Sequence, residues 1–379
     1  MKQGWTYKKL GEVCNIDYGT RVVRSKDAGS IYPVYGGGGA TFKMDTYNRE
    51  DSMVISRFGM SEQCTRFVKG KFFLNDSGLT LSMKEPCMIQ AFMDWEVFSL
   101  NNIIYSLGRG AAQKNLDTKA LAEIILSYPN SLSEQQRIVE RLDSAFAHID
   151  ELKANAEKQV NEARALFQKA LSKAMEPKEG WAYKKLGEVC EVINGLWKGK
   201  KAPFINVGVI RNANFTKDFS LRYDNIEFLD VEQRQYSKRK LLKGDLIVEK
   251  SGGSEKQPVG RAVLFDKDEG EFSFSNFTSV LRIKKDIDLT SKFLYIYLLY
   301  IYKRGDTASM QKATTGIHNI EFEKYLNIDI PYISLSEQQR IVSRLDSLSK
   351  NVKALEENQR KVMAECDALK QALLRKVFE

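Results

Sequence analysis

Two stretches of the chain repeat apolar residues at alternating spacings of four and three. In the first, nine of ten such positions are apolar, and the ten are Ile138, Leu142, Ala145, Ile149, Leu152, Ala156, Gln159, Ala163, Leu166 and Ala170. In the second, nine of ten are again apolar, and they are Ile341, Leu345, Leu348, Val352, Leu355, Gln359, Val362, Cys366, Leu369 and Leu373. This heptad pattern predicts two long helices that pair in a coiled coil. A polar residue within each seam, Gln159 or Gln359, commonly fixes the register.

The ends of these helices carry recognisable signals. Ser131 or Ser133 is the expected N-cap of the first helix, and Ser334 or Ser336 that of the second. Pro177 ends the first helix, because proline cannot continue it. The 46 residues from 131 to 176 would span about 69 Å at about 1.5 Å per residue. A helix of that length is a spacer.

The rest of the chain has shorter periodicities that indicate mixed α/β blocks. Runs of β-branched and aromatic residues between turn formers predict strands, at 52–56, 72–74, 79–83, 245–249, 261–265 and 279–283. Helices are expected at 119–126 and 291–303.

Two internal repeats organise the whole chain. GWTYKKLGEVC at Gly4–Cys14 recurs at Gly180–Cys190 with ten of eleven positions identical, and SLSEQQRIVERLDS at Ser131–Ser144 recurs at Ser334–Ser347 with thirteen of fourteen identical. The chain is therefore two copies of one unit, a globular block followed by a helix. We expect blocks at 1–130 and 177–333 and helices at 131–176 and 334–379.

The connectivity constrains how these parts are arranged. Each block leads into a helix, and no long return connection is available for a parallel pairing, so we expect the helices to be antiparallel. The two globular domains would then be related by a pseudo-twofold axis and separated by the helix pair.

The two blocks differ far more than the repeats that flank them. Only scattered features correspond: 51–59 loosely parallels 245–252, and 113–116 loosely parallels 317–320. A protein that keeps its frame and varies its loops usually varies what it recognises.

Charge adds a candidate partner. Lys+Arg is 58 and Asp+Glu is 49, a net charge of +9, and the two globular blocks carry +3 (16 − 13) and +5 (26 − 21) of it. This balance permits a polyanion such as double-stranded DNA, and it places the contacts on the blocks rather than on the helices. The candidate DNA-binding residues are polar side chains in loops: Arg57, Lys69, Lys71, Arg109, Gln113, Lys114, Lys198, Lys200, Arg211, Lys250, Ser251, Lys256, Lys312, His318 and Asn319. Each residue taken alone is more simply explained as a solvated surface group, and His318 serves a structural role equally well.

The sequence contains no set of residues that suggests catalysis by this chain. There is no Walker A motif, and two histidines and five cysteines without paired spacing give no metal site and no disulfide framework. The segment 245–250, DLIVEK, resembles a nuclease acidic cluster only faintly and is interpreted as a strand. The run Gly36–Gly39 is interpreted as a flexible loop, either structural or open to close approach by DNA. The longest apolar stretch is ten residues and the first ten residues lack an apolar region, so we expect a cytoplasmic protein with reduced thiols, no signal peptide and no membrane span.

The two KKLGEVC openings and the two LSEQQRIV helix starts resemble the specificity (S) subunit of type I restriction-modification systems. Segments such as YPVYGGGG and GDLIVEKSGGS occur in the order that this family shows, over essentially the whole chain. The resemblance implies that each globular domain is a target-recognition domain reading one half of a bipartite DNA site. The helices would set the gap and dock two methyltransferase (M) subunits, with restriction (R) subunits as further partners.

The resemblance further implies a non-catalytic chain without cofactors, because S-adenosylmethionine, ATP and Mg belong to the partner subunits. The repeated helix starts offer candidate partner contacts at Gln135, Gln136, Arg137, Gln338, Gln339 and Arg340. Helix capping explains these residues equally well. Two other classes of function remain as alternatives: a tether that holds two proteins apart without binding DNA, and a free-standing nuclease or methyltransferase, for which the motifs are missing.

Overall fold

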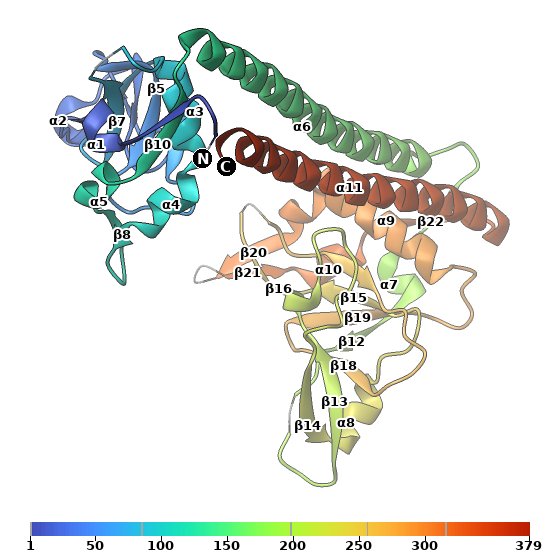
Figure 1. The fold of residues 1–379 in the computed structure, drawn as a ribbon. Coiled ribbons are helices and arrows are strands. Elements are labelled where there is room, and N and C mark those ends of the chain that lie inside the picture. Colours follow the sequence, from blue (N-terminus) through green and yellow to red (C-terminus); the bar gives the residue numbers. More distant parts are fainter. Residues whose placement is uncertain (1, 85, 198, 256, 315–316) are drawn as a thin grey trace. The chain divides into compact units, whose positions relative to one another are not determined.

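The computed structural model describes residues 2–84, 86–197, 199–255, 257–314 and 317–379. The chain forms two compact units (Figure 1). Unit 1 consists of residues 2–159 and 358–379, and unit 2 consists of residues 160–357. The predicted boundaries between blocks and helices therefore do not coincide with the boundaries of the compact units, because each unit includes parts of both long helices.

Unit 1 is built on a six-stranded sheet with the strand order β2-β7-β5-β6-β3-β4. The elements of its globular part are β1 (Trp5–Lys9), α1 (Leu10–Val13), β2 (Cys14–Tyr18), α2 (Arg24–Asp27), β3 (Tyr32–Tyr35), β4 (Lys43–Met44), β5 (Arg49–Ser56), β6 (Thr65–Leu74), β7 (Gly78–Met83), α3 (Gln90–Ser99), α4 (Asn101–Ser106), β8 (Gly108–Arg109), β9 (Asn115–Leu116), α5 (Thr118–Ala122) and β10 (Ile125–Pro129). β1 and β10 pair antiparallel, so the start and the end of the block lie side by side.

Unit 2 repeats this frame and adds to it. The elements of its globular part are β11 (Ala182–Lys185), α7 (Leu186–Val189), β12 (Cys190–Asn194), β13 (Phe204–Ile210), η1 (Asn212–Asn214), β14 (Glu227–Glu232), α8 (Gln233–Arg239), β15 (Leu246–Glu249), β16 (Ser251–Gly253), β17 (Ala262–Leu264), β18 (Phe272–Phe274), β19 (Thr278–Ile283), α9 (Ser291–Arg304), η2 (Asp306–Met310), β20 (Gln311–Thr314), β21 (Ile317–Ile320), α10 (Phe322–Leu326) and β22 (Asp329–Tyr332).

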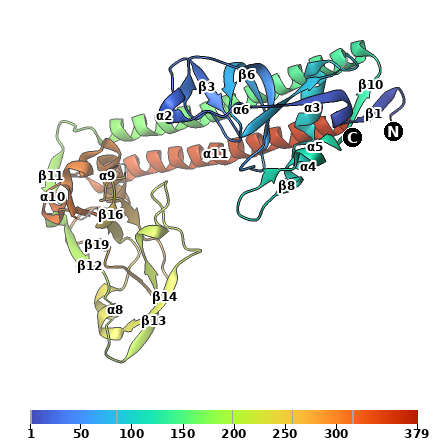
Figure 2. The same cartoon turned by 90° about the vertical axis from the view of Figure 1, so that its left-hand side faces the viewer.

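The shared frame is visible in the strand pairing. The antiparallel order β2-β7-β5 in unit 1 corresponds to β12-β19-β15 in unit 2, and the pair β1-β10 corresponds to β11-β22. In unit 2 the strands β14-β13-β18 form a separate sheet, and their pairing corresponds to that of β4-β3-β6 in unit 1, where these strands belong to the six-stranded sheet. With α8, the sheet β14-β13-β18 lies at the end of unit 2 away from α9 (Figures 1 and 2).

The two long helices are α6 (Leu132–Met175) and α11 (Leu335–Phe378), each of 44 residues. In unit 1, Lys153 Nζ lies 2.7 Å from Asp367 Oδ1, and Lys370 pairs with Asp150. The residue numbers rise along one helix as they fall along the other, so the expected antiparallel pairing is confirmed. In unit 2, Arg164 Nε lies 2.6 Å from Glu356 Oε1.

The predicted seam is correct on α11 for the most part and partly wrong on α6. Leu142, Ile149 and Ala156 are buried as expected, but Leu152 and Leu166 are 54% and 58% exposed. The buried residues of α6 also include Val139 and Phe146, each one position after a residue of the predicted seam, Ile138 or Ala145. On α11, Ile341, Leu345 and Cys366 are buried, whereas Leu369 is 49% exposed.

The cores of the blocks extend onto the helices, which explains this shift. In unit 1 the core includes Val139 of α6 and packs against Phe378 of α11, and Phe146 contacts Trp95 of α3 with ring centroids 4.4 Å apart. In unit 2 the core includes Leu171 and Leu345. The helices thus pack against a globular block as well as against each other, and Phe146 of α6 and Phe378 of α11 both contact rings of α3.

The strand predictions are confirmed, and one helix prediction needs correction. The apolar run at 293–302 is a buried part of α9. The helix expected at 119–126 ends at Ala122, and Ile125–Pro129 forms β10, because β1 offers it a partner strand.

Candidate nucleic-acid interface

Four segments of unit 1 meet at one edge of its sheet, and we call residues 18–20, 57–59, 75–77 and 113–116 the loop edge of unit 1. Thr20 N donates to Leu74 O (2.9 Å), Arg57 N donates to Ser77 O (2.8 Å) and Leu116 N donates to Arg57 O (2.8 Å). The buried strand β5 ends here at Ser56. These backbone bonds hold polar side chains from distant parts of the sequence beside one another.

Unit 2 repeats the same arrangement, and we call residues 195–197, 250–252, 275–277 and 317–320 the loop edge of unit 2. Leu196 N donates to Phe274 O (2.8 Å), Lys250 N donates to Phe277 O (2.9 Å) and Ile320 N donates to Lys250 O (2.8 Å). The loose parallels seen in the sequence, 51–59 with 245–252 and 113–116 with 317–320, are thereby confirmed as structural equivalence.

The loop edge of unit 1 presents a cation between two aromatic rings. The Arg57 guanidinium lies 4.8 Å from the ring centre of Tyr18 and 4.5 Å from that of Phe58. Asn115 Oδ1 accepts a hydrogen bond from Gly59 N (3.3 Å). Stacking on both rings restrains the planar guanidinium, which is then oriented in advance for a partner.

The loop Gly36–Gly39 is tied to this edge rather than free. Gly37 O accepts hydrogen bonds from Ser56 Oγ (2.6 Å) and from Arg66 Nη2 (2.7 Å). A side chain at Gly37 would lie 2.5 Å from Phe58 O, so the backbone packs there as only glycine allows. The expectation of a flexible loop is therefore wrong at Gly37.

The loop edge of unit 2 contains a network of polar side chains that are joined by hydrogen bonds. Ser251 Oγ donates to Asn319 Oδ1, and Asn212 Nδ2 donates to Ser251 O (2.6 Å). Five buried side-chain atoms of the described residues have no hydrogen-bond partner, and three of them are here: Asn212 Oδ1, Ser275 Oγ and His318 Nδ1. Because buried polar groups are normally paired, these three atoms mark a region of unit 2 where hydrogen bonding within the chain is incomplete.

Only some of the sequence candidates come together at the loop edges. In unit 1 these are Arg57, Gln113 and Lys114. In unit 2 they are Lys250, Ser251, His318, Asn319 and also Lys312, which pairs with Asn319 across β20 and β21. Lys198 and Lys256 lie outside the described residues.

The remaining candidates lie elsewhere or are already paired. Lys71 is opposite Glu50 at the other end of β5 from Arg57, and Lys69 precedes it on β6. Arg109 pairs with Asp117 and Arg211 with Glu227. Lys200 lies in a loop that Glu232 fixes by accepting its backbone N–H (2.6 Å).

Sequence reasoning missed several residues of these surfaces. Tyr18 and Phe58 flank Arg57, and Asn212 and Ser275 each have a buried polar atom without a hydrogen-bond partner. Trp197, within the loop edge of unit 2, is 65% exposed. The segment GLWKGKK, with an aromatic residue among cations, is the one signal that points to Trp197. Nothing local in the sequence brings Asn212 next to Ser251.

Two of the predicted partner contacts have an internal role instead. Gln135 is fully buried; its Oε1 accepts from Ile89 N (2.8 Å), and its Nε2 donates to Cys87 O (3.1 Å) and Pro129 O (2.8 Å). The expectation that Gln135 contacts another subunit is therefore wrong, because its polar atoms are occupied inside unit 1.

Gln338 repeats this arrangement in unit 2. Its Oε1 accepts from Thr290 N (2.9 Å), and its Nε2 donates to Asp288 O and Ile333 O (2.9 Å each). The same correction applies to it. The neighbouring candidates are exposed. Arg137 forms an ion pair with Glu134, and Arg340 forms one with Glu337, both at 2.7 Å. Gln136 and Gln339 lie beside them on the first turns of α6 and α11.

The acidic residues of 245–250 form structural ion pairs. Asp245 binds Arg282 (2.7 Å), and Glu249 binds Arg261 (2.7 Å), with both carboxylates almost fully buried.

Burial raises the pKa of Cys14 and of Cys190 to about 12, so neither thiol is prepared to act as a nucleophile. Over the described ranges, no group of three or more His, Cys, Asp or Glu residues is placed to hold a metal ion. None of the helices that the structure describes is both long and apolar enough to cross a bilayer.

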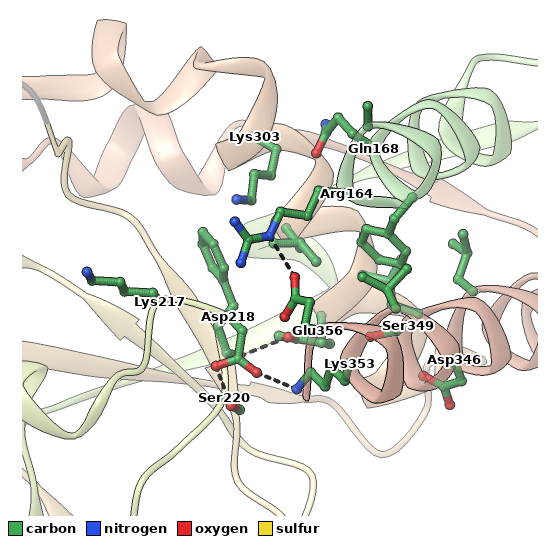
Figure 3. A pocket seen from close by; sticks show the side chains of 18 residues that line it. Arg164, Gln168, Lys217, Asp218, Ser220, Lys303, Asp346, Ser349, Lys353 and Glu356 are labelled. Carbon is green, nitrogen blue, oxygen red and sulfur yellow. Dashed lines mark hydrogen bonds and ion pairs between the residues drawn. The ribbon is translucent and has the colours of Figure 1, made fainter. Parts of the chain in front are cut away.

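A cavity of about 650 Å³ in unit 2 lies between α6, α9, α11 and the loop 216–220 (Figure 3). Asp218 pairs there with Lys353 of α11 and accepts from Ser220 Oγ (3.1 Å). Lys303 lies over the ring of Phe219, 4.7 Å from its centre. These contacts attach the loop 216–220 to α11 and α9, so the side chains that line the cavity help to hold the block on the long helix.

Comparison with known proteins gives consistent similarities. A family model described as the type I restriction modification DNA specificity domain matches residues 2–162 and 178–364. The specificity subunit of the type I restriction enzyme StySPI from Salmonella potsdam is 24% identical over 294 residues, and that of EcoKI from Escherichia coli K12 is 24% identical over 295 residues. Each alignment covers 73% of this chain and 62% of the relative, so the chain matches less than two thirds of these relatives' length.

Solved structures share the fold over the full length of the chain. A chain from a structural study of complex assembly and conformational transition of the type I R-M system aligns with a TM-score of 0.73 and 19% identity, covering 100% of this chain and 98% of that one. The HsdS subunit from Thermoanaerobacter tengcongensis aligns with a TM-score of 0.54 and 19% identity, covering 100% and 97%.

Proposed function

Because the chain belongs to the type I restriction modification DNA specificity domain family, we propose that it is the non-catalytic DNA-recognition subunit of a type I restriction-modification complex. In this proposal the blocks 1–130 and 177–333 are target-recognition domains, and each reads one half of a bipartite site in double-stranded DNA. Methylation and cleavage, with S-adenosylmethionine, ATP and Mg, belong to partner M and R subunits. We place the protein in the cytoplasm, where DNA and these partners are.

The observation that carries this proposal is the presence of two equivalent loop edges in one chain. Each loop edge follows a buried central strand. Each presents a cation, Arg57 or Lys250, beside an asparagine of another segment, Asn115 or Asn319. Two similar readers on one chain suit two half-sites, because binding of the first raises the effective concentration of the second.

The helices support the second part of the proposal. Segments 131–176 and 334–379 would set the gap between the half-sites and dock two M subunits. The exposed Gln136, Arg137, Gln339 and Arg340 occupy the same positions on the two helices. Two like surfaces suit two copies of one partner, and a pseudo-twofold axis between the domains would match the symmetry of the complex.

The test is single-molecule sequencing of methylated adenines in the host genome, with and without this gene. We expect a split motif with a fixed gap that loses methylation when the gene is deleted. Unchanged methylation, in a strain where the chain and an M subunit are both produced, would contradict the proposal. The tether alternative would then gain support, and it predicts no salt-dependent binding to a bipartite duplex.

A further inference from the structure

Arg57 and Lys250 occupy the same place in the two units. Each follows directly after a buried central strand, β5 or β15. Arg57 N donates to Ser77 O at 2.8 Å and Lys250 N to Phe277 O at 2.9 Å. Arg57 O accepts a hydrogen bond from Leu116 N, and Lys250 O accepts one from Ile320 N, at 2.8 Å in both units. The backbone therefore fixes two cations identically in the two loop edges.

Neither cation has a carboxylate partner among the residues that the structure describes. Both side chains are half-buried. Burial alone lowers the pKa of Lys250, since no nearby anion offsets the loss of solvent. Other cations of the blocks, such as Arg211 on Glu227, do have such partners. A half-buried cation without a counter-charge is unfavourable until an anion binds.

The surroundings of the two cations differ between the units. Arg57 lies between Tyr18 and Phe58, whereas Ser251 follows Lys250 and bonds to Asn319. The strands β13 and β14 are 7 and 6 residues long, whereas their counterparts in unit 1, β3 and β4, have 4 and 2 residues. Two half-sites of different sequence share only their sugar–phosphate backbone. Features common to both units therefore suit the phosphates, and features that differ suit the bases.

We propose that Arg57 and Lys250 each hold one phosphodiester group, at equivalent points of the two half-sites, and do not read bases. This inference rests on the proposed function. The two contacts would place each block on its half-site, while side chains that differ between the units would select the sequence.

The test uses the full chain assembled with its M subunits and a DNA duplex that carries the bipartite motif identified by methylation sequencing. Binding is measured by fluorescence anisotropy over a series of salt concentrations. For Arg57→Gln and Lys250→Gln we expect affinity to fall about tenfold and the slope of log K against log salt to become about one unit shallower. Methylation sequencing of strains carrying these variants should show an unchanged motif.

Matched controls separate the outcomes. Lys8 and Lys184 are equivalent residues on β1 and β11; Lys8→Gln and Lys184→Gln should leave affinity and slope unchanged. Arg57→Lys and Lys250→Arg keep the charge and should keep the slope, which attributes a change of slope in the Gln variants to the lost charge. A motif that relaxes at one base of one half-site, or a slope equal to that of the controls, would overturn the inference. Absence of any preference of the unaltered complex for the bipartite duplex would instead reject the proposed function.

Discussion

Gln359 Nε2 donates a hydrogen bond of 2.7 Å to Gln159 Oε1, and the two residues lie on the antiparallel helices α11 and α6 within unit 1. They are the polar interruptions of the two heptad seams, and they meet each other. A pair of amides satisfies its hydrogen bonds in one alignment of the helices and loses them in a shifted one. The pair therefore favours the observed register at some cost in stability.

The first prediction concerns this pair. Gln159→Leu combined with Gln359→Leu should raise the melting temperature by about 3 °C, because apolar seam residues bury more surface. Gln359→Ala loses the hydrogen bond without adding apolar surface and should cost under about 1 kcal/mol in the free energy of unfolding. Differential scanning calorimetry measures both effects. A lower melting temperature for the double Leu variant would show that the amide pair is itself stabilising.

The heptad pattern predicted that the two helices pair and the connectivity predicted that they are antiparallel, but neither predicted which face of α6 is buried. Two rows of apolar residues run side by side along α6. Ala145 belongs to the predicted seam, and the next residue, Phe146, belongs to the other row. Phe146 is buried because Trp95 of α3 packs on it, a contact that depends on the fold of the block. Leu152 lies in the predicted seam and stays 54% exposed. Periodicity identifies a helix that pairs, whereas the choice between neighbouring rows depends on a third element.

The internal repeat predicted only part of the interface, because it shows only the residues that the two copies share. Matching the two copies aligned Arg57 with Lys250 and Asn115 with Asn319, because the shared frame leaves a trace in the sequence. Asn212 follows β13, whose counterpart β3 is followed by glycines in unit 1, so matching the two copies does not single it out, and its contact with Ser251 O depends on tertiary folding. Gln135 was misinterpreted because a polar residue on the first turn of a helix normally faces solvent.

The second prediction concerns Gln135. Gln135→Ala leaves Ile89 N–H and two carbonyl groups without partners, so it should lower the free energy of unfolding by about 2–4 kcal/mol. Gln136→Ala is the matched control: Gln136 is exposed and bonds to Glu140 within α6, so the cost should stay below about 0.5 kcal/mol. Urea unfolding of both variants measures the difference. Equal midpoints would contradict the structural role of Gln135.

The third prediction concerns pH. Burial raises the pKa of Glu96 to about 8, against a hydrogen bond from Ser127 Oγ (3.1 Å) and the charge of Lys2, which lower it, while its Oε2 has no partner. The folded chain therefore binds more protons than the unfolded chain between pH 4.5 and about 8. The contribution of Glu96 to stability is full below pH 4.5 and is lost as pH rises toward 8.

Glu96→Gln removes this ionisation while keeping a similar shape. The variant should melt at a higher temperature than the unaltered chain above pH 8, and its melting temperature should change less between pH 5 and pH 8. Burial also raises the pKa of Asp94 to about 7, so part of the slope should remain in the variant and disappear when Asp94→Asn is added. Parallel pH profiles of the variant and the unaltered chain would contradict the assignment to Glu96.

The fourth prediction concerns the attachment of loop 216–220 to α11. Burial opposes the ionisation of Asp218, but hydrogen bonds from Lys353, Thr216 and Ser220 outweigh it and lower its pKa to about 2. The stabilising contribution of Asp218 is therefore present above pH 3.8, and it is lost as pH falls toward 2. At neutral pH Asp218→Asn should cost about 1 kcal/mol, because the ion pair with Lys353 is half-exposed and screened by solvent.

A local readout separates this attachment from general stability. Lys217 lies in the loop, so limited trypsin digestion of Asp218→Asn should cut after Lys217 several times faster than in the unaltered chain, because the loop opens more often once it is released from α11. Asp268→Asn is the matched control, since Asp268 also forms an ion pair with a lysine, Lys243, at an exposed position. Mass spectrometry of the fragments identifies the cut. Equal cleavage rates in the two variants would show that the contact with Lys353 does not hold the loop, and the Phe219 ring under Lys303 would then be the principal anchor.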